Sequence, residues 1–265
     1  MYDYFDIHSH LHFKDFDVDR EEVVSEMKKK NIATISVGVN FDTSQKEVEL
    51  AQNHENIFAC IGQHPDDSKE DVAFDERLIE LAGNSKVVAI GECGLDYFRL
   101  AGDVEKSKDD QKEKFLSHMD LAIKFEKPLM LHVRPSKGSQ DAYVDTLNIL
   151  EHHIKTSADK LHGNSHFFVG DLNTLKRFLN IGFSVSFTGV VTFTRDYDEL
   201  IKFAPIDMIM AETDAPFVAP VPYRGTRNSP LYVTEVVKKI AEIRGEPLEK
   251  VKTALVNNAL RHFNI

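Results

Sequence analysis

Two histidines separated by one residue stand near the start of the chain, in the pentapeptide Asp6-Ile7-His8-Ser9-His10. The apolar residues before them predict that this pentapeptide ends a short, buried strand. Side chains alternate across a strand, so His8 and His10 face the same way, with Asp6 below them on that side. Two neighbouring imidazoles can bind one divalent cation, because neutral histidine is the commonest metal ligand in proteins. Two solvated histidines near a terminus are the alternative interpretation of this pair taken alone.

Further histidines and carboxylates recur along the chain at or just beyond apolar runs. These residues are His64, Glu92, His132, His166 and Asp214. All except His166 come at the C-terminal end of a predicted strand, whereas His166 opens the run His-Phe-Phe-Val. A single buried histidine is more often a packed core residue than a metal ligand. Six predicted strands that each deliver such a side chain to one rim favour a metal site.

The types of these side chains indicate two metal ions rather than one. The candidate ligands exceed what one tetrahedral ion needs. They are His8, His10, Glu92, His132, His166 and Asp214. A carboxylate can bridge two ions ~3.5–4 Å apart, which suits in-line displacement at phosphorus. Glu92, which is central in the strand order, is the predicted bridge, and the mixed imidazole and carboxylate ligands leave zinc, manganese and magnesium all open.

Strand-like and helix-like stretches alternate along the chain, and these elements must position the candidate ligands. The first predicted strand ends within residues 6–10. The other seven cover residues 32–39, 57–62, 87–90, 129–132, 166–169, 183–187 and 208–211. The predicted helices include residues 19–30, 44–53, 75–82, 143–153, 172–179, 197–203, 231–243 and 248–262, with a long helix that ends at residue 125. Strict alternation predicts a parallel sheet, and eight units predict closure into a (β/α)8 TIM barrel with its active site at the C-terminal face of the strands. With 265 residues and no linker or short repeat, the chain is predicted to form a single domain over residues 1–265.

Composition limits the classes of protein that this chain can be. The formal net charge of −11 argues against a protein that coats nucleic acid through a broad basic face, although it permits a small nucleic-acid site where metal ions neutralise phosphate. No apolar run approaches the ~20 residues that span a bilayer, and no secretion signal is visible. Cys60 and Cys93 do not make a disulfide framework, so we expect a reduced, cytoplasmic setting without a membrane or an obligate protein partner. Cys93 is expected to point away from the site and to pack against a helix.

Eight motifs in order resemble those of the TatD family of metal-dependent hydrolases, a TIM-barrel branch of the amidohydrolase superfamily. The resemblance runs nearly end to end, from Asp6 to Phe263. The motifs are DIHSHLHF at Asp6, IGQHP at Ile61, IGECGLDY at Ile90, LHVR at Leu131, HFFVGD at His166, FSVSFTGVVTF at Phe183, ETDAPF at Glu212 and PVPYRGTRNSP at Pro220. The resemblance implies that the six candidate ligands hold two divalent ions (Mg, Mn or Zn). It also implies that Glu92 and Asp214 are catalytic, with Asp214 as the general base that activates the attacking water.

The resemblance further implies a deoxyribonuclease that cleaves phosphodiester bonds of DNA, in single strands or at 3′ ends, exonucleolytically. The alternatives are ester hydrolysis of D-aminoacyl-tRNA on the same metal site, with tRNA as the partner, and a catalytically silent barrel that only binds metal. The intact ligand set counts against the silent barrel, because a chain that had lost the reaction would have no reason to keep Asp214 and Glu92 together.

Loop residues beside the predicted rim are candidates for contact with a substrate. They are His64, Arg134, Arg224 and Asn228, and Asp96 is predicted to orient a metal ligand from behind it. His64 could contact a phosphate or a metal-bound water, or simply cap its loop. The arginines could hold phosphates bidentately, whereas surface solvation is the alternative for each and is favoured for Arg227. Asn228 is also expected to shape the last loop.

The chain departs from the family pattern in three places. His12 stands where the family usually has an aspartate after the first histidine pair, and we expect His12 to be a loop residue. The usual HCFSG appears as HFFVG, with His162 as a second histidine before it; the register of HFFVGD favours His166 as the ligand. The stretch Pro135–Gln140 looks like a small insertion on the active face, where it could alter substrate choice.

Overall fold

Eight parallel strands form one sheet whose spatial order is the order of the sequence. The computed structural model describes residues 2–66, 73–100, 102–157 and 161–265. The strands are β1 (Tyr4–Ser9), β2 (Ile32–Val37), β3 (Ile57–Ile61), β4 (Val87–Asp96), β5 (Leu129–Arg134), β6 (Gly163–Ser165), β7 (Ser184–Phe187) and β8 (Ile209–Ala211). The ends of β1 and β8 meet, because the N–H of Asp214 donates to the carbonyl of His8 at 2.9 Å and that of His10 donates to Ala215 at 2.8 Å. The sheet is therefore a nearly closed barrel, which confirms the predicted TIM-barrel fold.

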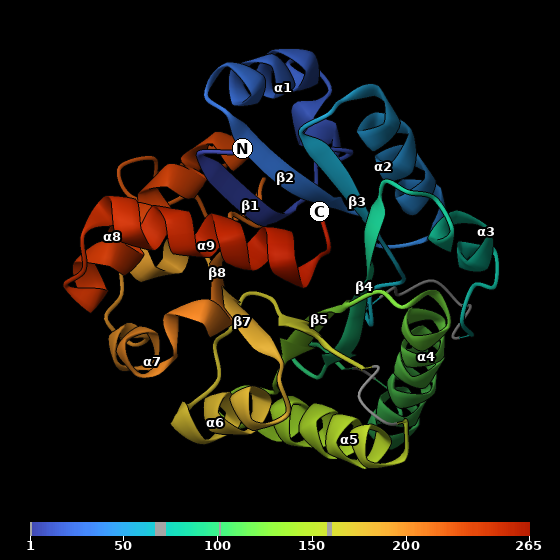
Figure 1. The fold of residues 1–265 in the computed structure, drawn as a ribbon. Coiled ribbons are helices and arrows are strands. Elements are labelled where there is room, and N and C mark those ends of the chain that lie inside the picture. The colour runs from blue at the N-terminus through green and yellow to red at the C-terminus, as the bar shows by residue number, and fades with distance from the viewer. Residues whose placement is uncertain (1, 67–72, 101, 158–160) are drawn as a thin grey trace.

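Helices connect successive strands and surround the barrel (Figure 1). They are α1 (Arg20–Lys29), α2 (Phe41–Asn53), α3 (Leu78–Ala82), α4 (Val104–Phe125), α5 (Asp141–Ser157), α6 (Leu172–Asn180), α7 (Asp198–Phe203), α8 (Val233–Arg244) and α9 (Leu248–His262), with short 3-10 turns at Lys14–Phe16, Gly189–Thr192, Ile206–Met208 and Pro230–Tyr232. Several begin where the sequence offers a capping side chain. Asp103 and Asp171 each accept a hydrogen bond from the backbone of the third helical residue, which satisfies a donor that the helix itself leaves free.

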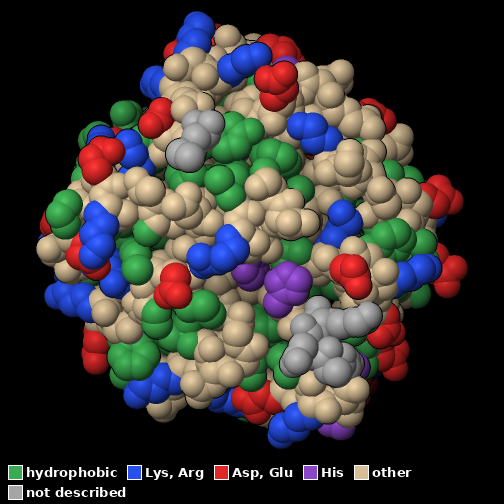
Figure 2. Space-filling view, viewed as in Figure 1, with side chains coloured by type: hydrophobic (Ala, Val, Ile, Leu, Met, Phe, Trp, Pro, Cys, Tyr) green, Lys and Arg blue, Asp and Glu red, His purple; other side chains and the backbone are tan. Residues whose placement is uncertain are grey.

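The last helix, α9, closes the end of the barrel at which the strands begin. The side chain of Asn258 donates to the carbonyl of Ile206, just before β8, and to that of Ile209, which begins β8. Phe263 packs with Phe5 among the side chains that fill the barrel. Both chain termini lie at this end of the barrel (Figure 1). On this face, basic and acidic side chains are interspersed and form no patch of one charge (Figure 2). A site at the strand ends must therefore lie on the opposite face.

Two strands differ from the prediction in ways that matter for the site. The sixth strand is Gly163–Ser165 rather than residues 166–169, because these three residues pair with β5 at Leu129, Met130 and Leu131. His166 thus follows the C-terminal end of β6, on the same rim as the other candidate ligands. β4 is longer than the predicted 87–90 and carries Glu92 within the strand.

The two cysteines are buried, free thiols on opposite sides of the sheet. Cys93 packs in the apolar layer between strands and helices, as predicted, whereas Cys60 belongs to the cluster inside the barrel. In the described part of the chain, every helix is too short or too polar to cross a membrane.

Candidate metal centre

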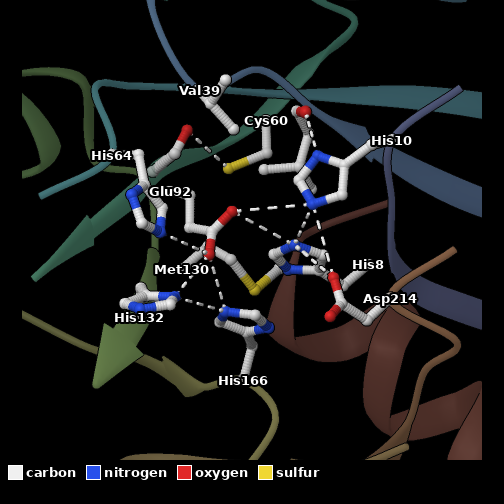
Figure 3. A network of polar contacts seen from close by, with 12 residues as sticks. His8, His10, Val39, Cys60, His64, Glu92, Met130, His132, His166 and Asp214 are labelled. Carbon is white, nitrogen blue, oxygen red and sulfur yellow. Dashed lines mark hydrogen bonds and ion pairs between the residues drawn. The ribbon is translucent and has the colours of Figure 1, made fainter. Parts of the chain in front are cut away.

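All six predicted ligands converge at the C-terminal ends of the strands (Figure 3). His8, Glu92 and His132 lie on β1, β4 and β5. His10 and His166 directly follow β1 and β6, and Asp214 lies in the segment after β8. Every one of them is buried except His132, which is partly exposed. Elements from the whole length of the chain therefore build one polar site above an apolar interior.

Four side chains form a first group around the end of β1. The Nε2 atoms of His8 and His10 lie 3.2 Å apart, and they lie 3.4 and 3.7 Å from Oε2 of Glu92. Oδ1 of Asp214 is 3.4 Å from Nε2 of His10 and 3.7 Å from that of His8. All of the atoms named here point at one small volume.

A second group surrounds the other oxygen of the same glutamate. Oε1 of Glu92 is 2.7 Å from Nδ1 of His132 and 2.9 Å from Nε2 of His166, and those two nitrogens are 3.4 Å apart. Nε2 of His64 lies 3.6 Å from the same oxygen. Glu92 thus presents one carboxylate oxygen to each group, which is the arrangement of a ligand that bridges two cations.

The spacing of the donor atoms fits metal binding. For Zn–N bonds of about 2.0–2.1 Å, the edge of a ligand tetrahedron is roughly 3.3–3.4 Å. The spacings of 3.2 to 3.7 Å within the first group match such an edge. Neutral imidazole and carboxylate donors suit zinc, manganese or magnesium, so the residues present fit a divalent ion.

In three of the histidines one ring nitrogen points toward the carboxylate of Glu92. The other ring nitrogen makes a hydrogen bond that holds the ring in this orientation. Nδ1 of His10 donates to the carbonyl of Val37 at 2.8 Å, which leaves its Nε2 as a ligand atom. Nε2 of His132 lies 2.9 Å from Oδ2 of Asp96, the residue predicted to orient a ligand. Nδ1 of His166 lies 3.2 Å from Oε2 of Glu212. Such partners fix the tautomer and direct the free lone pair toward a metal.

Glu212 is a functional residue that the sequence analysis did not assign. Besides His166, it accepts hydrogen bonds from the backbone of Phe167 at 2.6 Å and from the hydroxyl of Ser186 at 2.7 Å. It is fully buried. Its position directly after β8 and two residues before Asp214 was the available signal. Its partners come from other strands, and the sequence does not reveal that pairing.

Asp6 also supports the site from below rather than binding a cation. Its carboxylate accepts hydrogen bonds from the backbone and hydroxyl of Thr213 at 2.8 and 2.6 Å, and from the backbone of His8 at 3.2 Å. Complete burial raises the pKa of Asp6 well above its usual value despite these bonds. The residue ties the end of β1 to the segment that carries Asp214.

Electrostatics makes Glu92 the fixed negative charge of the site. Burial alone would raise its pKa, but His166, His8 and His64 around it hold the pKa well below the usual value. Burial would likewise lower the pKa of His166, yet Glu92 and Glu212 raise it well above normal. The carboxylate at the centre therefore attracts positive charge, whether that charge is a proton on an imidazole or a cation.

His64 lies at the edge of the second group, in the position predicted for a substrate or water contact. Burial and the neighbouring His132 lower its pKa to about 3, so it is neutral. Its Nδ1 accepts a hydrogen bond from the backbone of Asp66 at 3.1 Å, while its Nε2 faces Glu92. The loop-capping role of His64 is therefore present, and a contact of its Nε2 with a phosphate or a water stays a prediction.

The candidate arginines lie at the rim above aromatic rings. The guanidinium of Arg134 lies 4.0 Å from the ring centre of Phe98, and that of Arg224 lies 4.1 Å from the ring centre of Phe193. Arg224 also donates to the carbonyl of Ala219 at 3.0 Å. Arg227 instead forms a bidentate ion pair with Asp19, so its charge is used within the protein.

Asn228 is placed where it shapes a loop rather than where it could touch a substrate. It is fully buried, and its amide nitrogen donates to the carbonyls of Thr213 and Phe217 at 2.8 and 2.6 Å. These bonds fix the turn that holds Asp214. The structure therefore favours the loop-shaping role among the two that the sequence left open for Asn228.

The two alternative histidines lie outside both ligand groups. Nδ1 of His12 pairs with Oε1 of the buried Glu47, and its backbone N–H donates to the same oxygen at 3.1 Å. His162 immediately precedes β6, at the opposite end of that strand from His166, and its ring lies 5.6 Å from the ring of His262. Neither residue belongs to the groups of potential ligands found among the described residues.

Comparison with known proteins gives consistent matches over the whole chain. Residues 5–264 match the family described as TatD related DNase. A Bacillus subtilis protein described as the uncharacterized metal-dependent hydrolase YabD is 37% identical, with 98% of this chain and 99% of that protein covered. The Escherichia coli metal-dependent hydrolase YcfH is 30% identical, with coverage of 98% and 95%.

Solved structures give the same result. The crystal structure of YjjV, a TatD homologue from Escherichia coli, superposes with a TM-score of 0.87 at 26% identity, covering 99% of this chain and 98% of the other. An amidohydrolase from Saccharomyces cerevisiae shares the fold, with a TM-score of 0.82 at 18% identity over 98% of this chain and 99% of its own. The family match spans nearly every residue, and the ligand groups lie where such a barrel has its active site. The chain therefore belongs to the TatD family of metal-dependent hydrolases.

Proposed function

We propose that the protein is a deoxyribonuclease that uses two divalent cations to hydrolyse phosphodiester bonds of DNA, removing nucleotides from single strands or 3′ ends. The observation that carries the proposal is the placement of Glu92, with Oε1 against His132 and His166 and Oε2 against His8 and His10. His8 and His10 on one side of Glu92, and His132 and His166 on the other, would hold two cations, which would supply the charge that in-line displacement at phosphorus needs.

The chain's own residues divide the work around this pair of sites. Cations held there would polarise a phosphoryl oxygen and lower the pKa of water beside it. Asp214 is the base: its side chain is 12% exposed, compared with 0 to 4% for His8, His10 and Glu92, so it faces the opening from which water arrives. Its carboxylate takes the proton of the attacking water. Arg134 and Arg224 stabilise phosphate charge at the rim.

The proposal is tested by a panel of substrates with purified, metal-reconstituted enzyme. Single-stranded DNA, duplex DNA and D-aminoacyl-tRNA are each incubated with Mg²⁺, Mn²⁺ or Zn²⁺, with and without a chelator. Metal-dependent release of mononucleotides from single-stranded DNA is expected. Hydrolysis of D-aminoacyl-tRNA without cleavage of DNA would replace the proposed reaction by ester hydrolysis, and metal binding without turnover on any substrate would favour a silent barrel.

A further inference from the structure

A cleft of about 580 Å³ opens on the rim beside the metal centre. One side is the loop Pro135–Gln140, and Phe98, Arg134, Val169 and Tyr197 complete the lining. The volume lies within the roughly 300–1,000 Å³ that small-molecule sites occupy. The loop is also one of the three places at which the sequence is expected to depart from the family pattern.

The lining residues connect the cleft to the second ligand group. Arg134 comes two residues after His132 on β5, so both side chains point to the same side of the strand. Phe98 comes two residues after Asp96, and its backbone N–H donates to the Asp96 carboxylate that also holds His132. A molecule in the cleft is therefore next to the His132 side of Glu92 rather than the His8 side.

The loop is held in shape before any ligand binds. The backbone and hydroxyl of Ser136 donate to the carboxylate of Asp141 at 3.0 and 2.6 Å, and the backbone of Asp141 donates to Ser139 at 3.0 Å. Gly138 takes a left-handed φ of 76° at the tip, with open space where a side chain would be. A preorganised loop loses little entropy when it binds a ligand.

The chemistry of the walls selects a flat ring that carries an anion. Phe98 is 44% exposed, and the guanidinium of Arg134 lies 4.0 Å from its ring centre. Lys137 adds an exposed positive charge at the loop tip. The side-chain oxygen of Gln140 is buried without a hydrogen-bond partner among the described residues, so it can accept from an N–H of a nucleobase, such as the exocyclic amino group of adenine. Aromatic rings with arginine beside them are the usual platforms on which nucleobases stack.

We propose that this cleft is a nucleotide subsite, which stacks the nucleobase next to the scissile phosphate on Phe98 and Arg134 and places its phosphate toward Lys137. The inference rests on the proposed action on DNA and names how the substrate is held. The loop Pro135–Gln140 then sets which nucleotide is accepted at this position.

The test uses the absence of tryptophan from the chain. Phe98→Trp keeps a stacking ring and creates a sole indole whose fluorescence a stacked base quenches. Deoxyadenosine 5′-monophosphate (dAMP) is titrated into the metal-loaded protein; it contains no phosphodiester bond and is not turned over. Quenching by dAMP but not by deoxyribose 5-phosphate is expected. Phe203→Trp is the control, because Phe203 is 46% exposed beside Lys176 but lies on α7, outside the cleft.

A calorimetric titration of Phe98→Ala measures the size of the effect. Because stacking on one aromatic ring is lost, its affinity for dAMP should fall about 5- to 100-fold, while Phe203→Ala stays within about twofold of the parent. Lys137→Ala should reduce the preference for dAMP over deoxyadenosine. Equal quenching in the two tryptophan variants, or unchanged affinity in Phe98→Ala, overturns the subsite. Binding that follows this pattern in a protein that cleaves no DNA would retain the subsite and refute only the proposed reaction.

Discussion

Substitution of Asp214 by asparagine tests the mechanism at the most exposed side chain of the first group. Asp214 has a left-handed backbone with φ of 54°, and its N–H donates to the carbonyl of His8 at 2.9 Å. Asparagine and aspartate tolerate this conformation better than other residues with a side chain, so Asp214→Asn should keep the turn. The variant removes the charge and basicity of the carboxylate and little else.

The expected loss follows from the role of a positioned base. Such a base contributes roughly 10²–10⁴-fold to a rate, which corresponds to about 3–5 kcal/mol of activation free energy. His8, His10 and Glu92 stay in place, with Nε2 of His8 and His10 still 3.2 Å apart, so the first group keeps three ligands. We therefore expect turnover to fall about 10²-fold or more, while at least one metal ion stays bound.

The assay compares kcat on single-stranded DNA with metal content measured on the same sample. Asp207→Asn is the matched control, because Asp207 is an exposed residue just before β8, at the far end of that strand. If Asp214 only stabilises its turn, asparagine would serve nearly as well. Near-normal turnover of Asp214→Asn with full metal occupancy would refute the catalytic role.

Four further predictions concern the ligands, the footprint and the pH dependence. His166→Ala should lose metal from the second group and most activity, whereas His162→Ala, at the other end of β6, should keep both; the reverse pattern in a metal titration would contradict the ligand assignment. Because Glu212 orients His166, Glu212→Gln should weaken metal affinity roughly 10- to 100-fold, measured by competition with a chromophoric chelator. A short footprint predicts a log–log salt slope for single-stranded DNA binding of about −0.7 for each of roughly two to four phosphates, and a slope typical of ten phosphates would contradict it. Burial lowers the pKa of His118 from 6.5 to about 4. As the pH falls, the unfolded chain therefore binds a proton at this residue before the folded protein does, and the free energy of unfolding decreases. Between pH 7 and 5, denaturant unfolding should show that this free energy falls by about 2 kcal/mol more in the parent than in His118→Gln.

The convergence of the six candidate ligands could be predicted from the sequence because most of them lie on, or come soon after, a recognisable apolar strand. The sixth strand shows where this signal fails. The apolar run from His166 to Val169 resembles a strand, but the ladder is formed by the small and polar residues Gly163–Ser165. Asn164 is buried and pairs its side chain with Ser184 and Ser186, a contact between neighbouring strands that residue patterns do not reveal. Hydrophobicity identifies which segments are buried, whereas pairing with neighbours decides which residues form the strand.

Side chains that orient the ligands were harder to predict than the ligands themselves. Asp96, which shares the motif IGECGLDY with Glu92, was predicted to orient a ligand, and it does contact His132. Glu212 was missed as a partner of His166, since the two are brought together only because β6 and β8 lie on either side of β7. Asn228 was placed among candidate substrate contacts because it lies in a rim loop, yet both amide hydrogens are used within that loop.

The charges around the site explain how an acidic chain could act on a polyanion. Four carboxylates lie within the two ligand groups or directly behind them: Glu92, Asp96, Glu212 and Asp214. When ionised, they carry four negative charges that would repel a phosphate, and the net charge of −11 adds to that repulsion. Two divalent cations carry four positive charges and cancel this local excess. Affinity for the phosphate backbone would then depend on the cations and on the rim arginines. When a chelator removes the metal, the affinity for DNA should therefore fall together with turnover.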